Sequence, residues 1–114
     1  MAPAMLRALL LLLALGAAAA SAEPVAVAGA LRVEAVGEGA RVRLALSRAP
    51  AGALSHFHLA APDRIVIDIG GASTVRREVP GAGPVGTARV AQFDARTVRI
   101  VLEGAAPIRL AGAR

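Results

Sequence analysis

The sequence of 114 residues contains no cysteine, no tryptophan and no tyrosine, and it contains only two phenylalanines. The absence of cysteine excludes a disulfide framework and a cysteine nucleophile, so packing must stabilise the chain. The scarcity of aromatic side chains disfavours stacking on nucleic-acid bases and on sugar rings. The sequence also lacks a phosphate-binding glycine loop and a recognisable Ser/His/Asp set. We therefore predict a single domain with no catalytic residues and no cofactor.

The first 22 residues have the features of a secretory signal peptide. Arg7 and the amino terminus carry positive charge, an uncharged run rich in leucine and alanine follows, and Ala20-Ser21-Ala22 supplies small residues for cleavage. Only 15 uncharged residues separate Arg7 from Glu23, whereas a membrane-spanning helix needs about 20. We therefore predict a helical signal peptide, residues 1–22, that is cleaved between Ala22 and Glu23 and leaves no membrane span.

The remaining residues, 23–114, contain 12 arginines and 8 acidic residues, and hence carry a net charge of +4. The arginines are dispersed along the chain and not clustered. A basic balance favours an anionic partner, and for an exported protein this is a cell-envelope polymer or an anionic lipid surface, not nucleic acid. The alternative is that dispersed arginines keep a β-sheet surface soluble and guard its edges.

The chain after the signal peptide predicts an all-β fold. Ile65, Ile67 and Ile69 lie on one side of a central strand that a double glycine ends, and β-branched residues favour this strand over a helix. The predicted strands are residues 31–36, 41–46, 54–59, 65–69, 89–93 and 97–102, with an irregular edge strand around 74–79, a lead-in at 23–30 and a tail at 111–114. The hairpin 31–46 recurs as 89–102. We therefore predict a small β-sandwich of two sheets built from a duplicated hairpin unit.

Two details of strand pairing follow if apolar residues are kept in the core. We expect Phe57 to lie opposite Ile67 in the core, which places His56 opposite Asp68 on the outer face. In each copy of the duplicated hairpin, two apolar residues of the first strand are three positions apart, and a β-bulge between them would bring both into the core. The predicted bulges fall between Val33 and Val36 and between Val90 and Phe93.

Four segments, in their order and spacing, resemble the AMIN domain. They are Arg41 to Leu44, Ala61 to Asp68, Gly83 to Val85 with Arg89 to Asp94, and Val98 to Leu102. The resemblance covers residues 31–110, nearly all of the chain after the signal peptide. It implies an exported β-sandwich of the kind found at the amino terminus of periplasmic N-acetylmuramoyl-L-alanine amidases and in secretins of type IV pili. In the amidases this domain binds peptidoglycan and localises the enzyme, often to the division site.

The resemblance leads us to expect a non-catalytic module that binds peptidoglycan and localises an amidase-type protein in the periplasm. Envelope or division proteins are further candidate partners. Two alternatives stay open. The chain could be a protein–protein interaction module of an envelope assembly such as a pilus secretin, or part of a complete zinc amidase whose catalytic domain is not in this sequence.

The candidate binding residues are arginines expected on outer faces of the sheets. Arg41, Arg43 and Arg99, together with His56, are predicted to bind stem-peptide carboxylates, because guanidinium groups match carboxylates with two hydrogen bonds. His56 and His58 share a strand face, and with Asp68 they could hold a metal ion. Surface histidines on a solvated face are the commoner case, so we predict no metal. We interpret Asp63 as a turn-capping residue and Arg64 as bonded to a neighbouring carboxylate or carbonyl.

Overall fold

The structure is a computed structural model that describes residues 24–113. The predicted signal peptide and its cleavage junction between Ala22 and Glu23 lie outside these residues. The described chain contains strands and turns and no helix, which confirms the predicted all-β class. Its strands are β1 (Ala26–Val36), β2 (Gly39–Leu46), β3 (Leu54–Leu59), β4 (Arg64–Gly70), β5 (Ala72–Ser73), β6 (Arg77–Pro80), β7 (Val85–Asp94) and β8 (Thr97–Gly104).

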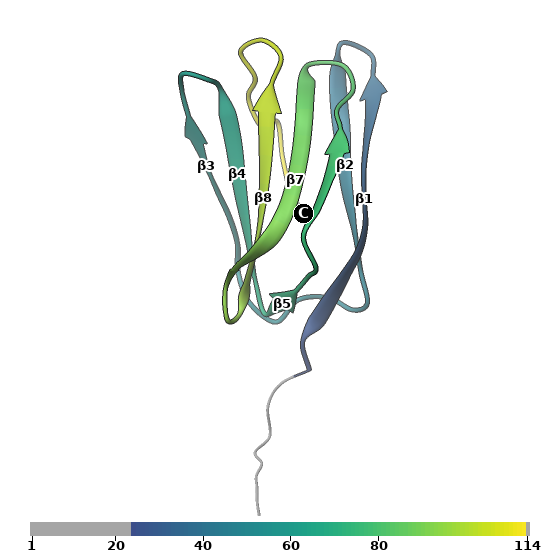
Figure 1. The fold of residues 1–114 in the computed structure, drawn as a ribbon, viewed down its shortest axis with the longest axis vertical. Helices are drawn as coiled ribbons and strands as arrows, with labels where there is room; N and C mark the ends of the chain where they lie inside the picture. The colour runs from purple at the N-terminus through teal and green to yellow at the C-terminus, as the bar shows by residue number, and fades with distance from the viewer. Residues whose placement is uncertain (1–23, 114) are drawn as a thin grey trace, which may run out of the picture.

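The strands form two sheets, as predicted (Figure 1). A three-stranded sheet has the order β2-β1-β5, and a five-stranded sheet has the order β3-β4-β8-β7-β6. The two similar hairpins, β1–β2 and β7–β8, lie in different sheets, and β1 packs beside β6 and β7. Within residues 24–113 there is no helix long and apolar enough to cross a membrane.

The core lies between the sheets and is built mainly from β-branched and small residues. On β4, Ile65, Ile67 and Ile69 are buried and pair with the buried side of β8, because directly opposed residues of antiparallel strands point to the same face. The other core residues are Ala26, Leu31, Ala72, Val85, Ala88, Val90, Val98, Ile100 and Leu102. Burying each valine, leucine or isoleucine contributes roughly 1.5–3 kcal/mol, so these inner faces determine which side of every strand points outward.

The predicted pairing of β3 with β4 is wrong by one residue. Phe57 lies opposite Val66, and His56 lies opposite Ile67. The reason is the connecting loop, which has four residues because Arg64 already belongs to β4 and pairs with Leu59. A slip of one residue exchanges the two faces of a strand. Phe57 therefore points to the outer face, and His56 points to the inner face.

The predicted bulges are only partly correct. The β1–β2 register is regular from Leu31 to Val36 and shifts earlier, between Ala28 and Leu31, so the bulge predicted after Val33 is absent. The β7–β8 register does shift between Gln92 and Asp94, but the shift leaves Phe93 54% exposed on the outside and not in the core. The strand β1 also begins at Ala26, inside the predicted lead-in, because Ala26 and Val27 pair with β5 and the Ala26 N–H donates to the Gly71 carbonyl.

Gly71 joins three parts of the fold at one point. Its N–H donates to the Arg96 carbonyl at 2.8 Å, and its own carbonyl accepts from the Ala26 N–H at 3.1 Å. Its φ of +75° lies in the left-handed region, and a Cβ atom added there would stand 2.9 Å from the backbone nitrogens of Ala51 and Gly52. Both features require glycine.

We expect Gly71→Ala to lower the free energy of unfolding by at least about 2 kcal/mol, because it combines left-handed strain with a backbone clash. The matched control is Gly37→Ala, since Gly37 also has a positive φ, +58°, but has open space around it. Strain alone should cost that variant about 1 kcal/mol. Urea unfolding of both variants measures the difference. Equal losses would show that the crowding at Gly71 relaxes.

Candidate functional site

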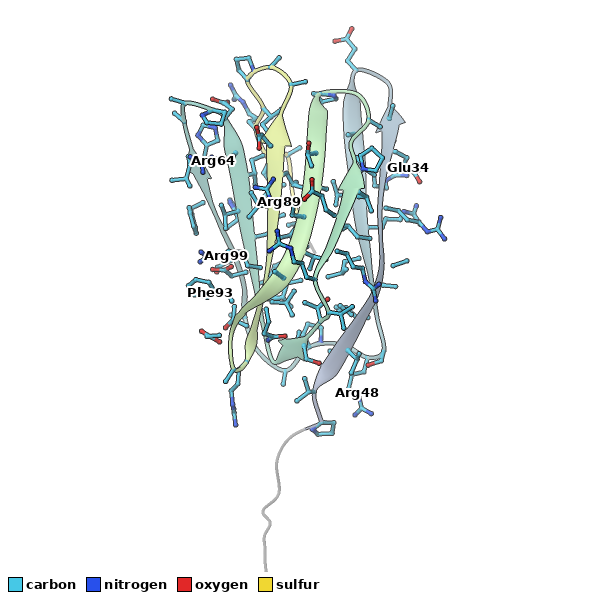
Figure 2. The ribbon with its side chains drawn as sticks, viewed as in Figure 1. Glu34, Arg48, Arg64, Arg89, Phe93 and Arg99 are labelled. Atoms are coloured by element: carbon cyan, nitrogen blue, oxygen red, sulfur yellow. The ribbon has the colours of Figure 1, made fainter. Side chains whose placement is uncertain are left out.

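The four predicted binding residues lie on three different surfaces and not in one site. Arg41 and Arg43 are on β2, on the outer face of the three-stranded sheet. Arg99 is on the outer face of the five-stranded sheet, and His56 is on the edge strand β3. In Figure 2, Arg99 and Phe93 lie on one side of the molecule and Glu34, from the three-stranded sheet, lies on the other. Any ligand contact must therefore be argued surface by surface.

The outer face of the three-stranded sheet carries two arginines directly opposite each other. The alternation of β2 packs Val42 and Leu44 against the core and leaves Arg43 exposed. Arg43 lies opposite Arg32 of β1, and within residues 24–113 neither takes part in an ion pair. Like charges in directly opposed positions repel and destabilise a sheet. A bound anion would remove that repulsion, so this basic pair, Arg32 and Arg43, is suited to an anionic ligand.

Arg41 stands beside the basic pair but already has a partial partner. It lies opposite Glu34, and its Nη1 is 3.8 Å from the Glu34 Oε1, with about half of both side chains exposed to solvent. An exposed pair at this distance is weak. Arg32 was not among the predicted residues. The two-residue turn that joins β1 to β2 determines its pairing with Arg43, so counting back from that turn would have identified it.

Arg99 is bonded to a carboxylate and lies against two aromatic rings on the outer face of the five-stranded sheet. Its Nε and Nη2 donate to the two carboxylate oxygens of Asp68 at 2.8 and 2.9 Å. Its guanidinium carbon lies 3.6 Å from the ring centre of Phe93 and 5.4 Å from that of Phe57. The hydrogen bond to Asp68 is the main cause that raises the pKa of Arg99 above its ordinary value. Asp68 thus pairs with Arg99 across β4 and β8, and not with His56 as predicted.

A shallow hollow adjoins this arrangement on the outer face. It is lined by Arg76, Arg89, Phe93 and Arg99, with apolar surface from neighbouring β7 and β8 residues. Arg89 is 3.7 Å from the Glu103 carboxylate, a loose contact between partly exposed groups. The hollow therefore combines exposed aromatic surface with arginines. One of these arginines, Arg99, is already bonded to Asp68.

His56 and His58 lie on the inner side of β3, whereas Asp68 lies on the outer side of β4. The sheet itself separates them, so these three residues cannot bind one metal ion. Within residues 24–113 no three His, Cys, Asp or Glu side chains are grouped closely enough to hold a metal.

Asp63 holds the carboxyl-terminal segment to the loop between β3 and β4. Its Oδ2 accepts from the Ile108 N–H and lies 3.1 Å from both that nitrogen and the His58 Nε2. The hydrogen bond from Ile108 is the first cause, and that from His58 the second, of an Asp63 pKa below its ordinary value. The neighbouring Arg64 donates from Nε to the Pro62 carbonyl at 3.3 Å, which confirms its predicted local role.

The family model described as AMIN domain matches residues 30–111. No curated protein and no solved structure matches the chain.

We predict that Arg99 and Asp68 stabilise the fold as a pair. Both side chains are less than one-third exposed, so Arg99→Ala or Asp68→Ala should each lower the free energy of unfolding by about 1–3 kcal/mol, since each leaves a charged group without its partner. The double variant should lose less than the sum of the two, with a coupling energy of about 1–2 kcal/mol. Urea unfolding of the four proteins measures this cycle. Additive losses would mean that the ion pair contributes nothing.

Asp63 gives the fold a defined acid sensitivity. Because the pKa of Asp63 is lower in the folded chain than in the unfolded one, the ionised carboxylate stabilises the fold. This contribution to the free energy of unfolding is complete above the unfolded pKa of about 3.9. The contribution is lost as the pH falls through the folded pKa. We expect Asp63→Asn to be less stable than the wild type at pH 6, and the difference to shrink below pH 4. Thermal unfolding of the two proteins at pH 6 and below pH 4 tests this. The same difference in stability under both conditions would contradict it.

Proposed function

The chain belongs to the AMIN family, since the family model covers most of its length, and we propose that it is a peptidoglycan-binding module of an amidase-type envelope protein. AMIN domains are non-catalytic modules that bind peptidoglycan and localise the amidases and secretins in which they occur. The proposal assigns this chain to the amidase type, where contact with the stem peptide would place a hydrolase beside the bond between that peptide and the glycan.

The basic pair on the three-stranded sheet is the observation that carries this proposal. Peptidoglycan stem peptides bear carboxylates, and a guanidinium group offers a planar fork of donors that matches a carboxylate. Arg32 and Arg43 face each other, are exposed, and have no ion-pair partner within the described residues. Arg41, with its loose contact to Glu34, can join them. The Arg99 guanidinium already donates two hydrogen bonds to Asp68, and His56 lies on the other sheet. Neither residue therefore belongs to this contact.

The proposed site of action is the periplasm. AMIN domains occur in periplasmic proteins. The basic, apolar and small-residue regions of residues 1–22 support export and cleavage between Ala22 and Glu23. Division-site recruitment would follow from the same wall contact if the bound peptidoglycan is enriched there.

We expect the purified protein to sediment with isolated sacculi, and the binding to weaken as salt is raised, because the contact is between exposed charges. Arg32→Ala combined with Arg43→Ala should weaken binding about tenfold, equivalent to about 1.4 kcal/mol, with no loss of stability because the repulsion between the pair is also removed.

The intact mass of the protein recovered after export should correspond to a chain that begins at Glu23.

The matched control is Arg48→Ala combined with Arg96→Ala. Both arginines are exposed, and Arg48 lies at the end of the molecule away from Glu34 in Figure 2. This control changes the net charge by the same amount. Equal losses in the two double variants would show that net charge, and not the basic pair, carries the binding. No sedimentation at low salt would refute wall binding altogether.

A further inference from the structure

The strand β3 is an open edge of the five-stranded sheet. It pairs with β4 on one side only, and all six of its residues, Leu54–Leu59, are exposed. Its three large apolar side chains, Leu54, Phe57 and Leu59, are 39–41% exposed. A strand with unused backbone hydrogen-bonding groups along its free side is a template for a further strand.

The hydrogen bond at the start of β3 determines which backbone groups are free. The Gly70 N–H donates to the Ala53 carbonyl at 2.9 Å and the Gly70 carbonyl accepts from the Gly52 N–H at 3.0 Å, so Ala53, next to the Leu54–Ile69 pair, stands at a hydrogen-bonded position of the ladder. In an antiparallel ladder such pairs alternate with non-hydrogen-bonded pairs. The N–H and C=O groups of Ser55, Phe57 and Leu59 therefore point toward β4. The N–H and C=O groups of Leu54, His56 and His58 point away from β4, toward the free edge of the sheet.

The other edge strands carry features that oppose pairing, and β3 does not. The four-residue strand β6 ends in Pro80 and contains both Arg77 and Glu78, β2 carries Arg41 and Arg43, and β5 has only two residues. Charged residues, proline and short length are the usual protections of a sheet edge. In β3 there is no proline, arginine, lysine or acidic residue.

The two faces of β3 differ in chemistry. On the outer face, Phe57 and Leu59 offer apolar surface. A groove beside β3 is lined on the inner side by His56, His58 and Ile65 together with Pro107, Ile108 and Arg109, and Phe57 also borders it. The acidic residue at this groove is Asp63, which is already bonded to His58 and to the Ile108 N–H. The inner side thus offers the His56 imidazole and the Arg109 guanidinium, and within residues 24–113 the one carboxylate lining the groove is already bonded to His58 and Ile108.

From this arrangement we propose that β3 binds an extended segment of another protein whose side chains alternate between apolar and acidic. The backbone groups of Leu54, His56 and His58 form the new ladder. The apolar side chains of the added strand pack beside Phe57 and Leu59, and its acidic side chains face His56 and Arg109. A second copy of this chain fits less well, because β3 carries no acidic residue and the paired domains would each bring a net charge of +4.

The test uses the full chain and a capped seven-residue peptide of alternating valine and glutamate. The peptide should slow hydrogen exchange at the amides of Leu54, His56 and His58 at least tenfold. The amides of Ser55, Phe57 and Leu59 should already exchange slowly without it. A peptide with lysine in place of glutamate should bind at least tenfold more weakly. Unchanged exchange at the three outward amides, or equal binding of the two peptides, would overturn the proposal.

Two substitutions at one position separate the backbone from the side chain. His56→Pro removes an outward N–H that β4 does not use, so the fold should persist while peptide affinity falls at least tenfold. His56→Val keeps that N–H and should bind within about threefold of the wild type. Equal binding by the two variants would contradict the proposal. Should His56→Pro fail to fold by circular dichroism, the exchange pattern of the wild type decides the question.

Two further results keep this contact distinct from wall binding and from self-association. The Arg32→Ala, Arg43→Ala double variant should bind the peptide as the wild type does, and His56→Pro should still sediment with sacculi. Slow exchange at the outward amides without peptide, together with a dimer by analytical ultracentrifugation, would assign the edge to a second copy and overturn the proposal.

Discussion

Each sheet buries one face against the other, and this burial determines where the outward-facing polar side chains lie. Ile65, Ile67 and Ile69 on β4 and their partners on β8 must face inward, because these six residues make up half of the twelve-residue core cluster of the described chain. Since side chains alternate along a strand, this requirement also decides which residues point outward. The positions of Asp68 and Arg99, and of the basic pair on the other sheet, are consequences of that burial.

The same constraint explains why both phenylalanines lie outside the core. Ala26, Ala72 and Ala88 are fully buried between the sheets, so the two layers approach each other closely where they meet and leave little room for aromatic rings. Phe57 and Phe93 instead flank the Arg99 guanidinium on the outer face. The Arg99 guanidinium, which the Asp68 carboxylate holds in place, lies over the Phe93 ring. This contact covers part of the aromatic surface on a face that the other sheet does not cover.

The sequence was sufficient to predict the all-β class, the two sheets and the family, because these depend on alternation and on the order of motifs. It was insufficient for register. The pairing of β3 depended on whether Arg64 belonged to the loop or to the strand, and one residue exchanged the faces of Phe57 and His56. Hydrophobicity alone placed Phe57 in the core, but the strand that carries it is an edge that the smaller sheet does not cover. Arg32 was missed because its significance comes only from the arginine opposite it.

The proposed wall contact and the proposed strand contact use different sheets and different chemistry. Exposed guanidinium groups on a flat outer face give a contact that salt weakens and that tolerates variation in the ligand. Backbone hydrogen bonds along an edge give a directional contact that depends on the added strand's alternation. Because the core fixes both surfaces independently, occupying one does not require the other to move. A module that localises a protein needs this separation, since it must hold the wall without blocking the partner it positions.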